Sequence, residues 1–75
     1  MPNYNQINVG DKFLHRDIYG LLIPCKVVGK SIVNHGGKCY QVRIEYDERH
    51  FRNTNERECI ILRNDGVFNT LIPAK

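Results

Sequence analysis

The stretch that decides the fold is CYQVRIEY, residues 39–46, in which apolar and polar side chains alternate. Its apolar side holds every second residue, namely Tyr40, Val42, Ile44 and Tyr46. Because successive side chains of a strand point to opposite faces of a sheet, this alternation predicts a strand with one buried and one solvated face. Gly36-Gly37, just before it, can adopt the positive φ angles of a tight turn. We therefore predict a hairpin whose first strand covers about residues 21–33, with a bulge at Gly29.

Three further strands are expected, at residues 9–15, 58–63 and 67–72. Asn64-Asp65-Gly66 is a strong turn signal, and it predicts a second hairpin between the last two strands, which ends at Pro73. The remaining segment, residues 47–58, has the composition of a long charged loop, with a helical turn near residues 53–57.

No stretch shows the apolar spacing of an amphipathic helix, so the sequence predicts an all-β, five-stranded small barrel. At 75 residues the chain has room for one domain, residues 1–75, with the barrel at about 7–72 and tails at 1–6 and 73–75. The expected core consists of Phe13, Val27, Val42, Ile44, Ile60 and Leu62. Since the chain starts at Met1 and ends soon after the last expected strand, we expect a free-standing module.

Composition places the protein among ordinary globular domains. Hydrophobic residues make up 41% and charged residues 25% of the chain, which does not indicate disorder. No apolar run is long enough to span a bilayer, and residues 1–10 lack the features of a signal peptide. The three cysteines, Cys25, Cys39 and Cys59, form no CxxC pair, whereas small secreted domains carry dense, even sets. We therefore expect reduced thiols and a cytoplasmic location.

The run GDKFLHRDIYG, residues 10–20, resembles the opening of bacterial Tudor-like or SH3-like small barrels. Residues 37–46 and 60–62 also look like later strands of these domains. Such barrels occur in CarD-like transcription factors, in the RNA-polymerase-interacting domain of the transcription-repair coupling factor and at the C-terminus of some repair helicases. The resemblance implies a partner in the transcription or DNA-repair machinery. The chain departs from the pattern at residues 21–24, where Leu-Leu-Ile-Pro replaces the usual second glycine, and in its long loop at 47–58.

The sequence nominates no catalytic group, cofactor or metal. Cys39 lies beside Lys38, but no histidine or carboxylate is placed by sequence to act as its base. His35 and Cys39 form one loose pair of ligands, whereas zinc sites use tight pairs. The acidic residues between 45 and 58 are interleaved with arginines, which is typical of a solvated face. We therefore expect a binding protein and not an enzyme.

Protein binding is the favoured function, through an open strand edge and the 47–58 loop. The loop offers a cluster that has the composition of an interface anchor, namely Arg49, His50, Phe51 and Arg52. The expected protein is a small regulator of transcription or of DNA-processing enzymes. An inhibitor of a host enzyme, encoded by a phage or a mobile element, fits the same sequence.

Direct nucleic-acid binding is the alternative. Residues 1–44 carry six Lys or Arg against two Asp, so the positive charge gathers in this half. A basic patch on adjacent strands would comprise Lys26, Lys30, Lys38 and Arg43. Bases could stack on the aromatic residues Tyr4, Tyr19 and Phe51. A weaker hypothesis is an aromatic cage for methylated lysine, built from Tyr19, Tyr40, Tyr46 and Phe51.

Overall fold

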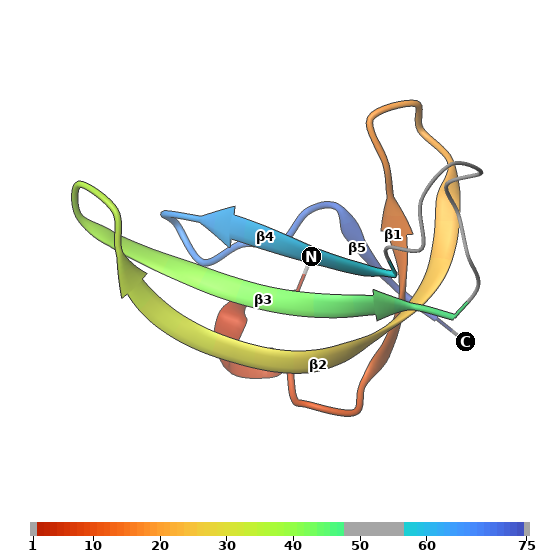
Figure 1. The fold of residues 1–75 in the computed structure, drawn as a ribbon, viewed down its shortest axis with the longest axis horizontal. Coiled ribbons are helices and arrows are strands. Elements are labelled where there is room, and N and C mark those ends of the chain that lie inside the picture. The colour runs from red at the N-terminus through yellow and green to blue at the C-terminus, as the bar shows by residue number, and fades with distance from the viewer. Residues whose placement is uncertain (1, 48–56, 75) are drawn as a thin grey trace.

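Five antiparallel strands in a single sheet make up most of the computed structural model, which describes residues 2–47 and 57–74. The strands are β1 (Lys12–Arg16), β2 (Leu22–Asn34), β3 (Lys38–Tyr46), β4 (Glu58–Arg63) and β5 (Leu71–Pro73), preceded by one turn of 3₁₀ helix, η1 (Tyr4–Gln6). They lie in the order β4-β3-β2-β1-β5, so β4 and β5 are the two edges of an unclosed sheet (Figure 1). The prediction of an all-β fold is confirmed. No helix in the described residues is long and apolar enough to cross a membrane.

The β2–β3 hairpin forms where the sequence predicts it. Gly36 and Gly37 have φ angles of 69° and 140°, and the Asn34 side-chain oxygen accepts a hydrogen bond of 3.0 Å from the Gly37 N–H. A register shift between Val27 and Gly29 confirms the predicted bulge. β2 is longer than any other strand: residues 22–26 pair with β1, and residues 25–34 pair with β3.

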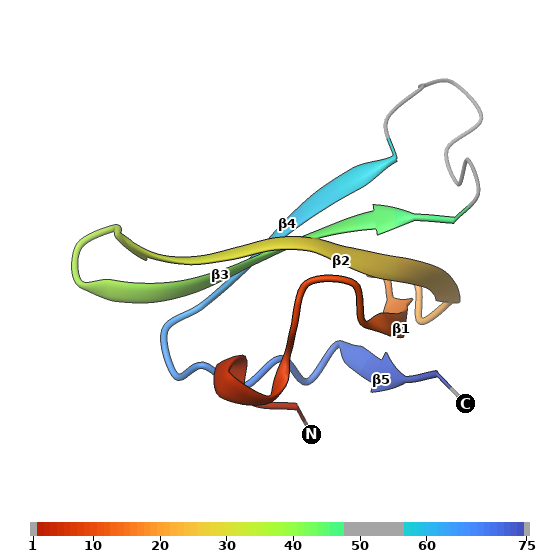
Figure 2. The ribbon, with the colours of Figure 1, turned by 90° about the horizontal axis from the view of Figure 1, so that it is seen from below.

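The sheet curls so that its two ends form separate layers. Figure 2 shows η1 and β5 on one side of β2 and β3, with the connection from β4 to β5 running between the ends of the sheet. Apolar side chains fill the space between the layers, and the buried set is Ile7, Phe13, Ile23, Cys25, Val27, Val42, Ile44, Tyr46, Phe68 and Leu71. Chain segments outside the strands supply Ile7 and Phe68, which are fully buried.

Four of the six predicted core residues are buried: Phe13, Val27, Val42 and Ile44. The prediction for the other two is wrong, because Ile60 is 56% and Leu62 is 44% exposed. The register sets Cys59 opposite Ile44 and Ile61 opposite Val42, so the odd-numbered residues of β4 share the core face. A shift of one residue moves a whole strand's side chains to the other face. Residues 59–62 are all apolar, so their pattern could not choose between the two faces.

The predicted second hairpin is also wrong. β5 pairs with β1, with Leu71 opposite His15, and makes no ladder with β4. Residues 67–70 instead cross between the layers and bury Phe68 completely. This burial takes the chain away from β4, so the strand begins at Leu71 and not at residue 67.

Residues 2–6, which we expected to form a tail, lie against the body of the protein. The Tyr4 N–H donates to the Gly66 carbonyl at 2.8 Å, and the Phe68 N–H donates to the Pro2 carbonyl at 3.0 Å. An isolated bridge joins Asn3 to Val67. These bonds hold η1 beside the connection from β4 to β5.

Candidate functional site

The unclosed sheet leaves a groove between the edge of β4 and the β1–β2 turn, which we call the seam groove. Its volume is about 590 Å³. Its walls come from the end of β1 and the turn after it, from β4 and from Thr70. The lining residues include His15, Arg16, Ile18, Tyr19, Tyr46, Cys59, Ile60, Leu62 and Arg63.

Two buried rings form the polar floor of the seam groove. The Nδ1 atom of His15 lies 2.9 Å from the Tyr46 hydroxyl, and the rings stack with their centroids 5.8 Å apart. Burial lowers the pKa of His15 below its usual value, and the charge of Asp17 offsets only part of that shift. Burial also raises the pKa of Tyr46 above its usual value. Both side chains are therefore neutral at pH 7, and the floor carries no charge of its own.

Large apolar side chains form the rim. Ile18 is 91% and Tyr19 is 80% exposed, and they lie at the tip of the β1–β2 turn. The Asp17 carboxylate fixes this turn, since its Oδ1 accepts bonds of 2.9 Å from the N–H groups of Tyr19 and Leu21. Because the Asp17 side chain and the turn's own backbone hold this conformation, the turn does not need to bury its apolar side chains and can present them to solvent. Contiguous exposed apolar surface of this kind is typical of interaction sites.

The edge of β4 borders the groove along its length. The Tyr46 N–H donates to the Arg57 carbonyl at 2.6 Å, which marks the start of the β3–β4 ladder. Hydrogen-bonded pairs alternate along an antiparallel ladder, so the backbone groups of Glu58, Ile60 and Leu62 face away from β3. Within the described part of the chain, no strand pairs with β4 on that side. β4 therefore presents a strand edge next to an apolar groove.

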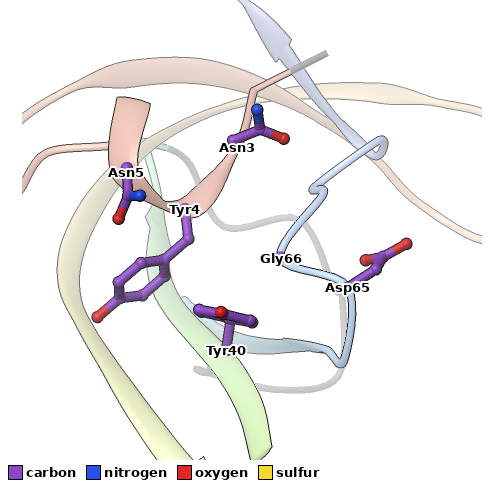
Figure 3. A pocket seen from close by; sticks show the side chains of 6 residues that line it. All are labelled: Asn3, Tyr4, Asn5, Tyr40, Asp65 and Gly66. Atoms are coloured by element: carbon purple, nitrogen blue, oxygen red, sulfur yellow. The ribbon is translucent and has the colours of Figure 1, made fainter.

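A second, smaller cleft lies at η1 and shares no lining residue with the seam groove. Its volume is about 270 Å³, and its lining is Asn3, Tyr4, Asn5, Tyr40, Asp65 and Gly66 (Figure 3). The rings of Tyr4 and Tyr40 lie 5.0 Å apart at an angle of 51°. We call this feature the tyrosine cleft.

The four cations of the predicted basic patch lie on two faces of the sheet. Lys30 and Lys38 lie beside the tyrosine cleft. The Lys30 Nζ atom is 4.4 Å from the centroid of the Tyr4 ring, and the Lys38 Nζ atom is 5.1 Å from the centroid of the Tyr40 ring. Lys26 alternates with buried neighbours, so it points to the opposite face, across from Glu45. Arg43 also points there, with its Nε 3.6 Å from the Glu58 carboxylate. The four residues therefore do not form one patch.

Two further predicted sites are the protein-binding loop and the aromatic cage. Arg49, His50, Phe51 and Arg52 lie outside the described residues, so the prediction for this loop stays untested. The weaker hypothesis of a methyl-lysine cage fails for Tyr40 and Tyr46, because Tyr46 is buried at the floor of the seam groove whereas Tyr40 lines the tyrosine cleft.

The three cysteines lie in different environments. Burial raises the pKa of Cys25 to about 11, and the charge of Asp47 adds to the effect. Cys39 is half-buried in β3, and Cys59 lines the seam groove. In residues 2–47 and 57–74, no three His, Cys, Asp or Glu side chains gather in a way that could hold a metal ion.

Comparison of the chain with protein-family models, curated proteins and solved structures finds no match. The resemblance to Tudor-like barrels therefore stays a prediction. Sequence reasoning missed the seam groove, because the groove depends on which strands fail to pair. The only sequence signal for the groove is the pair Ile60 and Leu62. Residues 59–62 are all apolar, whereas a strand with one core face needs an apolar residue only at every second position.

Proposed function

We propose that this protein is a non-catalytic module that binds an extended segment of a partner protein along the edge of β4. The observation that carries the proposal is the juxtaposition of that edge with the seam groove. An exposed strand edge accepts an added strand through main-chain hydrogen bonds, and adjacent pockets for alternate side chains give specificity. At about 590 Å³ the groove has the size of a ligand pocket.

The chemistry of the groove favours a mainly apolar segment with some acidic residues. Ile60 and Leu62 extend the rim along β4, where an added strand would lie. Arg16 and Arg63 border the same groove and would pair with carboxylates of the partner. Such rim charges act on association rate and specificity more than on affinity.

We also propose that the sheet is an opened form of the SH3-like or Tudor-like barrel. The resemblance in residues 10–20 supports this assignment and, with it, a partner in the transcription or DNA-repair machinery. Fold alone does not determine function, so the partner class rests on the resemblance, whereas the mode of binding rests on the geometry. A host-directed inhibitor would use the same edge.

The test is capture of partners from a nuclease-treated bacterial lysate on the immobilised protein, with the captured proteins identified by mass spectrometry. Ile60→Lys places a charge on the β4 edge and should abolish capture of the specific partner. Ile32→Lys is the matched control, since Ile32 is 52% exposed against 56% for Ile60 and lies outside the groove. A partner that Ile60→Lys retains as well as the wild type does would refute binding at this edge. Absence of RNA polymerase and DNA-repair enzymes from the captured set would refute only the partner class.

A further inference from the structure

The tyrosine cleft brings together residues from three separate parts of the chain. Tyr4 comes from η1, Tyr40 from β3, and Asp65 and Gly66 from the connection after β4 (Figure 3). Gly66 permits the close approach of the Tyr40 ring, since a Cβ added at that position would lie 3.3 Å from two ring atoms. Tyr4 is held in turn by the bond from its N–H to the Gly66 carbonyl. The two rings are therefore positioned by backbone contacts before any ligand binds.

Two ammonium groups lie beside these rings. The Nζ atom of Lys30 donates to the Tyr4 carbonyl at 3.1 Å and lies over the Tyr4 ring. An ammonium group has three N–H donors, so this bond uses one of them. Lys38 is exposed, and its Nζ lies over the Tyr40 ring. Because both cations accompany the rings, the cleft is poorly suited to bind a further cation such as methylated lysine.

We propose that the tyrosine cleft binds single-stranded nucleic acid: the exposed Lys38 ammonium leaves the Tyr40 ring for a phosphate, a base stacks on that ring in its place, and Lys30 contacts the adjoining phosphate. Sequence-tolerant proteins that bind single strands combine aromatic rings for the bases with cations along the backbone. The volume of about 270 Å³ is below that of a typical drug-sized pocket, so it suits one planar group. The amides of Asn3 and Asn5 at the cleft provide donors and acceptors for base edges.

This site is independent of the proposed partner-binding edge. The two share no lining residue, so a substitution in one can be made without altering the other. Asp65 limits the phosphate path on one side, because its carboxylate repels phosphate. Its Oδ1 atom also lies 3.9 Å from the Arg63 Nε atom. The expected path therefore runs from the cleft toward Lys30 and Lys38.

The experiment is fluorescence anisotropy with labelled oligo(dT) of about ten nucleotides in about 50 mM salt. Lys38→Glu should weaken binding about tenfold, whereas Lys26→Glu should change it less than about twofold. The two variants alter net charge equally, but Lys26 lies on the opposite face of the sheet. With two phosphates neutralised, the logarithm of affinity should fall with the logarithm of salt at a slope of about −1.4.

A second pair of variants tests the rings. Tyr40→Leu should weaken binding at least about fivefold, and Tyr40→Phe should restore it, because stacking needs the ring and not the hydroxyl. If Tyr40→Leu does not fold, the two lysine variants decide the question. Equal losses in Lys38→Glu and Lys26→Glu would show attraction to net charge only and would overturn the site. No anisotropy change at about 100 µM protein would overturn nucleic-acid binding itself.

Discussion

The register of β4 determines both the core and the partner-binding edge, and it can be tested with two adjacent isoleucines. Ile60 is 56% exposed, whereas Ile61 packs against the core opposite Val42. Replacing either by Ala removes the same three carbons. At about 0.8 kcal/mol for each buried carbon, full burial corresponds to about 2.4 kcal/mol before any cavity term. Ile60 is less than half buried, so Ile60→Ala should cost about 1 kcal/mol and Ile61→Ala about 2 kcal/mol.

Ile44→Ala supplies the reference for a core position, since Ile44 is fully buried and its loss should cost about 2–5 kcal/mol. A domain of this size has a free energy of unfolding of about 4–11 kcal/mol, so all three effects are measurable. The assay is equilibrium urea unfolding followed by far-UV circular dichroism, because the chain has no tryptophan. An unchanged m-value is needed for the comparison. If Ile60→Ala cost as much as Ile44→Ala and more than Ile61→Ala, β4 would be in the opposite register and the reasoning would be refuted.

Three further predictions concern other parts of the fold. Phe68→Ala should cost about 3–5 kcal/mol by urea unfolding, because the ring is fully buried; a cost below about 1 kcal/mol would support the hairpin that we reject. The folded-state pKa of His15 is lowered, so the stability linked to it is present above about pH 6.5 and is lost as the pH falls below that value. The urea midpoint of the wild type should therefore fall more steeply with decreasing pH than that of His15→Gln, and equal slopes would contradict this. Mass-spectrometric mapping of iodoacetamide labelling should find Cys39 modified well before Cys25, whose thiol is buried with a pKa raised to about 11; labelling at equal rates would contradict the burial of Cys25.

The candidate sites followed from the sequence only in part. Lys30 and Lys38 were expected in a basic patch, but their association with Tyr4 and Tyr40 depends on how η1 docks onto the sheet. Strand alternation alone cannot place two segments that are distant in the chain side by side. The separation of Lys26 from Lys30 has a local cause, because the bulge between Val27 and Gly29 changes which face the following residues occupy.

The sequence by itself determined the all-β class, the β2–β3 hairpin with its bulge at Gly29 and the bounds of β4. These features depend on local rules, since alternation and glycine conformations act over a few residues. Only the tertiary structure decided the face of β4, the partner of β5 and the burial of Ile7 and Phe68. Residues 59–62 are uniformly apolar and fit either face, so contacts with β3 select the register. The seam groove likewise exists because β4 and β5 stay unpaired, and the pairing of distant strands depends on packing across the whole molecule.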